Sequence, residues 1–545
     1  MKFDSLVSAK SWGRQSHNYL KATVGDRIGE VAGDPGGVSG AQHAKKRICR
    51  ELGRSVGSQL RLSMPAQRPY GRRRADGPTE VGPVHSTLRA GKPHTWGRDW
   101  AGMGNPPAKG NTVRTQRRVA VNTALTRIAQ KARLEPKTRF SALAHLITPA
   151  FLMENWHKMN KRGAAGVDGE TAREFATNLQ GRCEQLVVKL KGRSYRPPPV
   201  RRVEIPKGDG KTRPLGIPTV EDRLLQRTVA GILEAIFEAD FLDCSYGFRP
   251  GRGAHNAIAA LRNQCMVGKV STVFEADIRG FFNHLDHKWL MKMLRQRIGD
   301  RVILRLVGRW LRAGTFQNGV VLESEEGSPQ GGPISPLLAN IYLHFVLDLW
   351  FTKVITPRCR GKAHLVRYAD DFVVGFQFES DAKQFSKDVQ ERLAKFNLEL
   401  AENKTRLLHF GRYQIRPEEK SGTFDFLGFQ HVGGRDRRGR FAVLRLPTRK
   451  SCSKFLRNVK DKLRQMQPVP GPDQQRVLTR MLNGFYQYFG LHGAQRRLRL
   501  VLNYVYQNWR RTIRRQGQRS KHTWTVLNRK PWFKLPEPRV FHPMV

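Results

Sequence analysis

The segment 365–376, LVRYADDFVVGF, places two adjacent carboxylates, Asp370 and Asp371, between two apolar runs. β-Branched and aromatic residues on both sides of a short polar step predict a β-hairpin with these side chains at its tip. Because carboxylates this close repel each other, we expect a cation beside them. Oxygen ligands favour a hard ion such as Mg²⁺ over zinc. An isolated Asp-Asp pair is more often a solvated turn, so the interpretation depends on the rest of the chain.

A third carboxylate comes from the segment 270–284, VSTVFEADIRGFFNH. Its β-rich run ends at Asp277, which predicts a strand that delivers one carboxylate at its end. Phosphoryl transfer with two metal ions, roughly 3.5–4 Å apart, needs carboxylates that are shared between the ions. A lone Asp after a strand is usually a helix cap, so its catalytic role depends on the combination with Asp370 and Asp371.

The composition points to nucleic acid as the partner. Among 545 residues, 97 are Lys or Arg and 45 are Asp or Glu, a formal charge of +52. Charge of this size favours a polyanion partner, and it is densest at the ends, with +14 in residues 1–120 and +23 in residues 411–545. No apolar run approaches the roughly 20 residues that span a membrane, and residues 1–21 lack the apolar core of a signal peptide. The six cysteines are scattered without a C-x-x-C pair, which argues against a disulfide framework or a structural zinc site and fits a reducing compartment.

Residues 1–120 are rich in Gly, Arg, Ser and Pro, which predicts a basic, flexible arm that either contacts RNA or DNA or is dispensable. The segment 203–218, VEIPKGDGKTRPLGIP, reads as two short strands with Lys207 and Arg213 beside a glycine-rich turn. Such residues suit a triphosphate or a nucleic-acid backbone, although basic hairpins are also common solvated surface. A helix is predicted over 219–237, with Thr219 as its N-cap.

Two loops carry further candidate residues for contacts with nucleic acid. The loop 246–253, YGFRPGRG, presents Arg249 and Arg252 beside aromatic residues, which suits a template backbone, and ordinary packing of those aromatics is the alternative. Gln330 and Gly331 precede a helix that Ser335 would cap, and they leave a backbone platform for a base pair.

The last third of the chain is expected to change from strands to helices. A helix is predicted over 381–397, a strand–turn–strand with Lys404 over 398–411, and a strand pair over 424–430. Residues 451–516 have a helical, strongly basic pattern with interleaved aromatics. The predicted RNA-binding residues are Arg249, Arg252, Lys454, Arg457, Lys460, Arg496, Arg497, Arg510 and Arg511.

Seven blocks in order resemble a reverse transcriptase, and more narrowly the protein encoded within bacterial group II introns. The blocks are 205–226 (IPKGDGKTRPLGIPTVEDRLLQ), 245–258 (SYGFRPGRGAHNAI), 276–282 (ADIRGFF), 327–343 (GSPQGGPISPLLANIYL), 366–374 (VRYADDFVV), 402–411 (ENKTRLLHFG) and 424–429 (FDFLGF). With the helical region that follows, the resemblance covers about residues 140–515.

The resemblance implies an α+β right-hand polymerase with a ferredoxin-like palm and an all-helical thumb or maturase domain. The expected division is an arm over 1–120, fingers over 121–260, a palm over 261–435, a thumb over 436–516 and an irregular basic tail over 517–545.

The resemblance also implies roles for single residues. Asp277, Asp370 and Asp371 would hold two Mg²⁺ ions, with the Ile278 carbonyl as a further ligand. Lys404 matches the position proposed as the general acid for pyrophosphate departure. The remaining candidates are Lys207 and Arg213 as a triphosphate clamp, Phe282 as the aromatic that excludes a ribose 2′-hydroxyl, and Gln330 and Gly331 against the nascent base pair. Phe281 and Phe282 could instead both belong to the core.

The resemblance to this family also implies the substrates, the partners and the cellular location. We expect dNTP substrates, an RNA template with a DNA primer, group II intron RNA and target DNA as partners, and a bacterial cytoplasm with nucleoid association on DNA. Nothing after residue 516 supplies the ligands of the His-Asn-His endonuclease that many family members carry. Asn283 stands where an Asp is frequent. The alternatives are a maturase that only assists splicing and a domesticated reverse transcriptase used in defence or repair.

Overall fold

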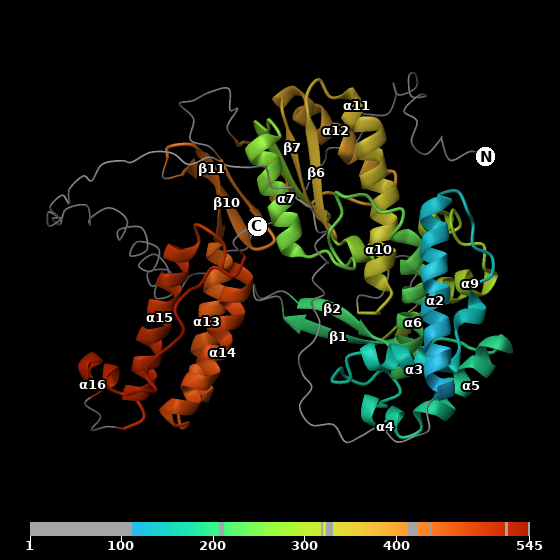
Figure 1. Ribbon diagram of the computed structural model, residues 1–545, viewed down its shortest axis with the longest axis horizontal. Helices are drawn as coiled ribbons and strands as arrows, with labels where there is room; N and C mark the ends of the chain where they lie inside the picture. The colour runs from blue at the N-terminus through green and yellow to red at the C-terminus, as the bar shows by residue number, and fades with distance from the viewer. Residues whose placement is uncertain are drawn as a thin grey trace, which may run out of the picture. The chain divides into compact units, whose positions relative to one another are not determined.

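The computed structural model describes residues 112–206, 212–317, 320–322, 331–411, 422–436, 438–517 and 522–542. The predicted arm lies outside the described residues up to position 111, and its last residues already belong to helix α2 (Thr112–Leu134). The described chain mixes helices with three sheets, which agrees with the predicted α+β class (Figure 1).

One sheet carries the predicted hairpin. Its strands are β3 (Thr272–Asp277), β6 (Ala363–Tyr368), β7 (Asp371–Phe376) and β8 (Arg406–His409), in the order β6-β7-β3-β8 with antiparallel neighbours. Helices connect β3 to β6, and α12 (Glu379–Ala394) connects β7 to β8. This βαββαβ connectivity is the ferredoxin-like arrangement. The predicted hairpin is confirmed, because every residue of β6, beginning at Ala363, pairs with a residue of β7, which begins at Asp371.

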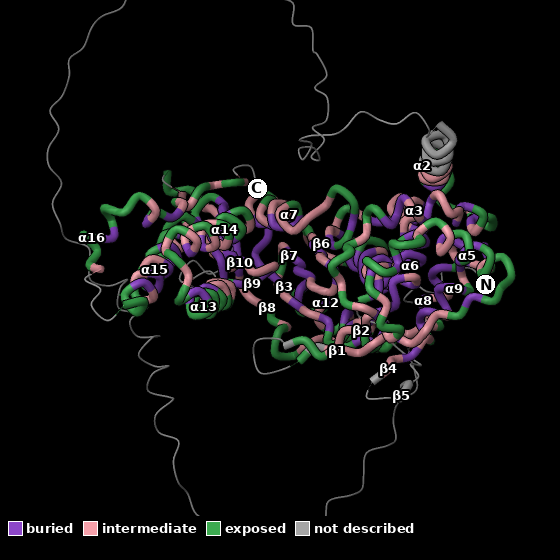
Figure 2. The backbone as a smooth tube through the Cα atoms, turned by 90° about the horizontal axis from the view of Figure 1, so that it is seen from below, coloured by how far each residue is buried: buried purple, intermediate pink, exposed green. Residues whose placement is uncertain are grey.

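Strand β7 in the middle of this sheet is buried on both faces, and its residues are apolar on both sides. Phe372 and Val374 of β7 belong to one core, and Val373 between them belongs to another. Helix α12 covers the first face, where Phe385 meets Phe274 edge-on with ring centroids 5.3 Å apart. Helix α7 (Ala254–Val267) packs on the second face through Leu261 (Figure 1). Figure 2 shows the buried backbone running through β3 and β7.

A continuous helical stretch, Ser335–Arg358, crosses the first core. It comprises α10 (Ser335–Leu343), two π-helical segments, η4 (His344–Asp348) and η5 (Phe351–Ile355), and α11 (Thr356–Arg358). The predicted cap is wrong by one residue, because Ile334 is the N-cap and Ser335 is the first helical residue. By length and composition the stretch could cross a membrane, but 78% of its apolar window is buried inside the protein, as in a core helix.

A second sheet has four strands in the order β2-β1-β4-β5. Its strands are β1 (Val200–Pro206), β2 (Thr212–Ile217), β4 (Thr315–Gln317) and β5 (Val320–Leu322). The helices that flank these strands in the sequence are η2 (Ala144–Leu146), α3 (Pro149–Lys158), α4 (Ala172–Ala176), α5 (Leu179–Lys191), α6 (Val220–Phe237), α8 (His287–Leu294) and α9 (Arg301–Leu311). Thr219 caps α6 as predicted, accepting a hydrogen bond from the Asp222 N–H at 3.2 Å. β4 and β5 fall within the predicted palm, but β4 pairs with β1 of the predicted fingers, and β5 pairs with β4.

The C-terminal part combines a small sheet with helices. Its elements are β9 (Thr423–Phe426), β10 (Phe429–Arg435), β11 (Phe441–Pro447), α13 (Arg449–Gln465), α14 (Gly471–Phe489), α15 (Gln495–Arg514) and α16 (Trp524–Asn528). The predicted strand pair and the predicted helical region are both present. The predicted boundary at 435 is misplaced, because it divides the β10–β11 hairpin.

The predicted irregular tail is also corrected. Residues 517–545 include helix α16, and Leu527, Phe533 and Leu535 are buried in the core of the C-terminal helices. The Phe533 ring stacks on Trp509 at 4.5 Å. The tail therefore belongs to the folded unit.

We expect Phe533→Ala to lower the free energy of unfolding by about 3–5 kcal/mol, because it leaves a cavity against Trp509. Urea denaturation followed by Trp fluorescence measures this. Phe541→Ala is the matched control, since the Phe541 side chain is 42% exposed and its loss should change stability little. Equal effects of the two changes would show that the tail does not pack as described.

Candidate active site

The strand register brings two of the predicted carboxylates together. Asp277 at the end of β3 pairs directly with Asp371 at the start of β7. Asp371 also pairs with Tyr368 across the hairpin, so Asp370 lies in the two-residue turn. Asp277 thus meets Asp370 and Asp371, which follow it by more than ninety positions in sequence, at one end of the sheet.

Electrostatics show that these carboxylates repel each other. The pKa of Asp371 is raised to about 7, first by burial and then by the charges of Asp277 and Asp370. A carboxylate with so high a pKa binds a proton or another cation readily.

Lys404 provides one positive charge at this site. It ends the 3₁₀ segment η6 (Glu402–Lys404), and its ammonium donates a hydrogen bond to the Asp277 carboxylate. The pKa of Lys404 is raised by this bond and by the charges of the three aspartates. The Lys404 side chain is 65% exposed, so it reaches the site from the solvent side.

The Ile278 backbone lies next to the triad. Ile278 forms an isolated bridge with Leu400, through bonds from Ala401 N to Asp277 O at 2.8 Å and from Arg279 N to Glu399 O at 2.8 Å. Neither bond uses the Ile278 carbonyl, whose role as a ligand stays a prediction.

The donor set fits a hard divalent cation in its chemistry, because three carboxylates and a carbonyl offer only oxygen. Within the described residues, no group of three or more His, Cys, Asp or Glu side chains is gathered closely enough to hold an ion. The Lys404 ammonium instead neutralises Asp277.

The two phenylalanines after Asp277 differ in their surroundings. Phe281 is 2% exposed and packs edge-on against Tyr342 at 6.2 Å, so it belongs to the core. Phe282 is only half-buried and contacts Phe281 edge-on at 5.3 Å. Phe282 therefore remains available for the predicted contact with a nucleotide sugar.

The predicted nucleotide-binding residues are described only in part. Lys207 and Gln330 lie outside the described residues, and Arg213 is described as part of β2. Gly331 has a φ of 128°, and a Cβ there would lie 2.4 Å from the Gly216 carbonyl oxygen. Only glycine fits this position, which lies against β2.

The prediction that Arg249 binds RNA is corrected by its position. Arg249 is 7% exposed, and its guanidinium pairs with Glu238 at 2.6 Å and donates to the Leu242 carbonyl at 2.7 Å. A buried guanidinium with these partners stabilises its loop and is not free for phosphate. Arg252 is also engaged, in an ion pair with Asp243.

The other predicted RNA-binding residues lie on the C-terminal helices. Lys454, Arg457 and Lys460 are exposed on one face of α13, at a spacing of three residues. Arg497 instead donates to the Pro447 carbonyl at 2.6 Å and holds α15 against β11. Of the predicted residues on α15, Arg496 and Arg511 are exposed, whereas Arg510 stacks on the Trp524 ring.

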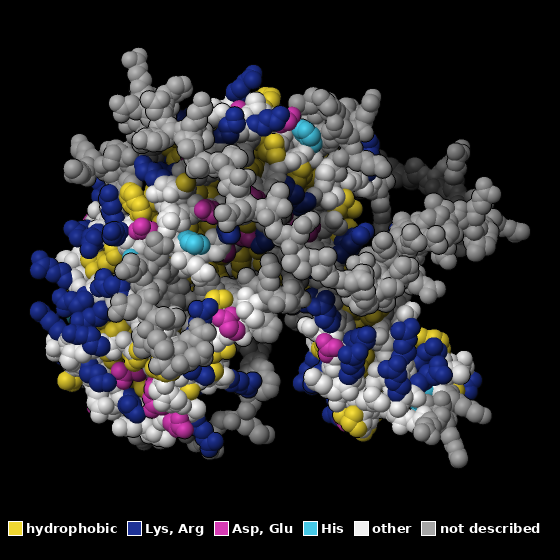
Figure 3. Space-filling view, turned by 180° about the vertical axis from the view of Figure 1, so that it is seen from behind, with side chains coloured by type: hydrophobic (Ala, Val, Ile, Leu, Met, Phe, Trp, Pro, Cys, Tyr) yellow, Lys and Arg dark blue, Asp and Glu magenta, His cyan; other side chains and the backbone are white. Residues whose placement is uncertain are grey.

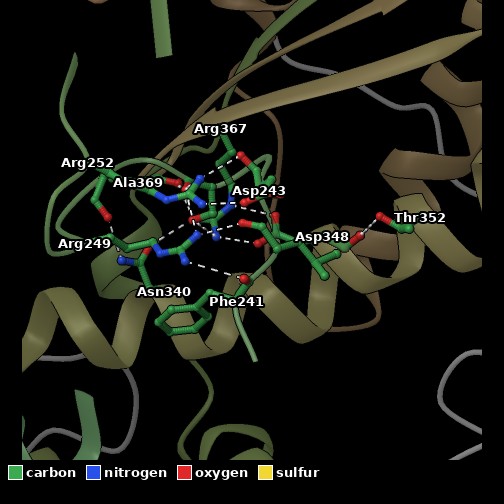
Figure 4. Close-up of polar contacts among 12 residues, drawn as sticks. Phe241, Asp243, Arg249, Arg252, Asn340, Asp348, Thr352, Arg367 and Ala369 are labelled. Carbon is green, nitrogen blue, oxygen red and sulfur yellow. Dashed lines mark hydrogen bonds and ion pairs between the residues drawn. The ribbon is translucent and has the colours of Figure 1, made fainter. Parts of the chain in front are cut away.

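Sequence reasoning missed the buried network behind the catalytic turn (Figure 4). Arg367 and Asp348 are both fully buried and form a bidentate pair, Nε to Oδ1 at 2.7 Å and Nη2 to Oδ2 at 2.6 Å. The other guanidinium protons reach Asn340 Oδ1 at 3.1 Å, Ser245 Oγ at 2.8 Å and the Ala369 carbonyl at 3.0 Å. A sequence signal existed in the arginine placed within an apolar strand, but its partners are not visible from the sequence.

This network holds the turn in an unusual backbone conformation. Ala369 has a φ of 57°, in the left-handed region that non-glycine residues rarely adopt. The Gly247 backbone lies so close that a Cβ there would be 2.5 Å from Ala369 N. Strain of this kind persists only where the surroundings enforce it, and here Arg367 and Gly247 do so.

The raised pKa of Asp371 predicts a pH-dependent stability in the absence of metal. The folded pKa of about 7 lies above the usual Asp value of about 4, so the cost of burying and crowding this charge is absent below pH 4, grows between pH 4 and pH 7, and is complete above pH 7. In EDTA, Asp371→Asn should therefore raise the free energy of unfolding by up to about 4 kcal/mol at pH 8 and by much less at pH 5. Asp461→Asn on α13 is the control, and a gain independent of pH would contradict the assignment.

The buried ion pair predicts that removing one partner destabilises the protein more than replacing both. Arg367→Met leaves Asp348 buried without its partner and should cost about 3–5 kcal/mol in urea denaturation. Arg367→Met with Asp348→Leu should recover part of that stability, because no unpaired charge remains. Arg464→Met, whose side chain is 67% exposed, is the surface control. A double variant no more stable than the single one would argue against the pair as described.

Comparison with known proteins gives a consistent result. The family model described as reverse transcriptase (RNA-dependent DNA polymerase) matches residues 205–431. The chain is 34% identical over 354 residues to protein YkfC of Escherichia coli K12, spanning 58% of this chain and 90% of YkfC. It is 32% identical over 334 residues to the group II intron-encoded protein LtrA of Lactococcus lactis subsp. cremoris, spanning 50% of this chain and 55% of LtrA. Over 90 residues it is 33% identical to the Arabidopsis thaliana nuclear intron maturase 1, spanning 16% of this chain and 12% of that protein.

The matched region contains Asp277, the YADD hairpin and Lys404, the residues that the fold brings to one end of the sheet. The chain therefore belongs to the reverse transcriptase family of group II intron-encoded proteins, which are RNA-directed DNA polymerases.

Proposed function

We propose that the chain extends a DNA primer on an RNA template by nucleotidyl transfer with two Mg²⁺ ions, using dNTPs. We further propose that it binds group II intron RNA, assists splicing and copies RNA into DNA at a DNA target during retrohoming. The observation that carries the proposal is the direct pairing of Asp277 with Asp371, with Asp370 beside them in the turn.

Asp277, Asp370 and Asp371 would hold the ions, together with the Ile278 carbonyl. When bound, Mg²⁺ ions neutralise the charge that develops on the attacking and leaving oxygens. The chain's own contribution is to fix three carboxylates that repel each other, and the raised pKa of Asp371 supports this role.

Other residues would orient the nucleotide. Lys404 keeps its proton because the three aspartates raise its pKa, and it would donate that proton to the leaving pyrophosphate. The half-buried Phe282 would restrict the sugar to deoxyribose. Lys207 and Arg213 would bind the triphosphate, and Gly331, with Gln330, would lie against the base pair.

A basic face would bind RNA outside the catalytic residues. Lys454, Arg457 and Lys460 share one exposed face of α13, which suits a phosphate backbone. This face supports the maturase role, and the relatives named for introns support it as well. Such a protein would act in the cytoplasm and at the nucleoid when bound to DNA.

Primer extension tests the polymerase assignment. On an RNA template with a DNA primer, dNTPs and Mg²⁺, Asp277→Asn and Asp371→Asn should each lower kcat about a thousandfold or more, because the loss of metal binding removes several kcal/mol of stabilisation. Asp388→Asn on α12 is the matched control and should extend the primer normally. Unchanged primer extension by the two triad variants would contradict the proposal.

A splicing assay separates the RNA role from the polymerase role. The triad variants should still support splicing of a group II intron transcript if the RNA surface acts independently of the catalytic carboxylates. A protein that extends primers but never promotes splicing would instead fit a domesticated reverse transcriptase.

A further inference from the structure

A hollow of about 450 Å³ lies along helix α9, on elements other than the strands that carry the triad. Met291 and Leu304 contribute apolar surface to it, and no Asp or Glu lines it. Five arginines surround it: Arg139, Arg295, Arg301, Arg305 and Arg312.

The spacing of residues on α9 explains why the arginines converge. Arg301, Arg305, Gly308 and Arg312 are three or four residues apart, so they follow one face of the helix. Gly308 has no side chain, and its position forms the floor between arginines. A Cβ at Gly308 would come no closer than 3.7 Å to the Arg312 guanidinium, so a side chain could be added there.

The carboxylates nearest to the hollow in the chain have partners other than its arginines. Asp300, just before α9, is 5% exposed and accepts backbone hydrogen bonds from four N–H groups. These donors belong to Leu143, Ala144, Val302 and Ile303, at 2.7 to 3.1 Å. Asp240 pairs with Arg297, which does not line the hollow.

Further positive charges lie beside the hollow. The pKa of Arg309, one turn from Arg305, is lowered by burial and then by the charges of Arg196 and Arg305. Figure 3 shows Lys and Arg side chains gathered along the edge of the molecule that carries α9. An anion at this place would relieve repulsion among fixed cations.

We propose that this hollow binds the phosphate backbone of an RNA strand at a site separate from the acidic triad. Five guanidinium groups exceed the charge of a single phosphate, so successive phosphates of one strand match them better than a free anion does. Arginine pairs with phosphate through a fork of donors, and Met291 and Leu304 offer apolar contact to the sugar. The choice of RNA as the strand rests on the proposed function.

The sharpest test introduces a negative charge without removing an arginine. Gly308→Glu places a carboxylate among the arginines, and Gly308→Gln is its neutral match of the same size. Binding of a fluorescein-labelled group II intron transcript to the full chain is measured by anisotropy. We expect Gly308→Glu to weaken RNA binding about tenfold, through the loss of one to three phosphate contacts, and Gly308→Gln to change it less than about twofold.

A second variant replaces two of the arginines and leaves the buried face of α9 unchanged. Arg301→Gln with Arg305→Gln changes two exposed side chains and should reduce the slope of log K against log salt by about 1.4, or 0.7 per lost phosphate contact of a single strand. Thermal melting verifies the fold of each variant.

Three outcomes would overturn the proposal. Equal weakening by Gly308→Glu and Gly308→Gln would indicate a steric effect, and unchanged binding in both the Glu and the double variant would exclude an RNA site. Competition by inorganic phosphate at concentrations that leave bulk salt effects unchanged would indicate a site for a free anion. Primer extension on a short template should stay within about twofold for every variant, so failure here is distinguishable from failure of the polymerase assignment.

Discussion

The ion pair between Arg367 and Asp348 is the constraint on which the catalytic end of the sheet depends. Both side chains are fully buried, where separate charges would be very unfavourable. The pair is tolerated because it is bidentate and the remaining donors reach Asn340, Ser245 and the Ala369 carbonyl. Through this arginine, β6, the first π-helical segment in the middle of the long helix and the loop before α7 are joined to the turn that carries Asp370. The π-helical segment ends at Asp348, which agrees with the frequent occurrence of such segments at functional sites.

The need for this support follows from the charges in front of the turn. Asp277, Asp370 and Asp371 repel one another, as the raised pKa of Asp371 shows. Without a bound cation the hairpin tip would relax if its backbone were free to move. The left-handed Ala369, the close Gly247 backbone and the Arg367 bond to the Ala369 carbonyl hold it in place. The site is thus preorganised from behind, where the side chains are buried, and open in front, where Lys404 is exposed.

The sequence predicted the local elements well, because periodicity and capping are local properties. The hairpin at Asp370, the strand ending at Asp277 and the cap at Thr219 all occur as expected. The prediction failed where the outcome depends on distant partners. Arg249 reads as an exposed loop residue, yet Glu238 and backbone carbonyls enclose it. Arg367 contacts Ser245, 122 positions away, and no local pattern indicates that contact. The burial of Phe533 in the tail likewise depends on helix α15.

These cases show that the positive charges behind the net charge of +52 are not spread evenly over the protein surface. Arg249 and Arg367 are surrounded by acceptors, and their charge is neutralised inside the protein. Arg301 and Arg305 face a hollow without a carboxylate, and their charge stays available to a ligand. The two groups have the same side chain, so composition alone cannot separate them. What separates them is whether the fold brings an acceptor to each guanidinium, and this criterion, unlike total charge, identifies which cationic surfaces can bind phosphate.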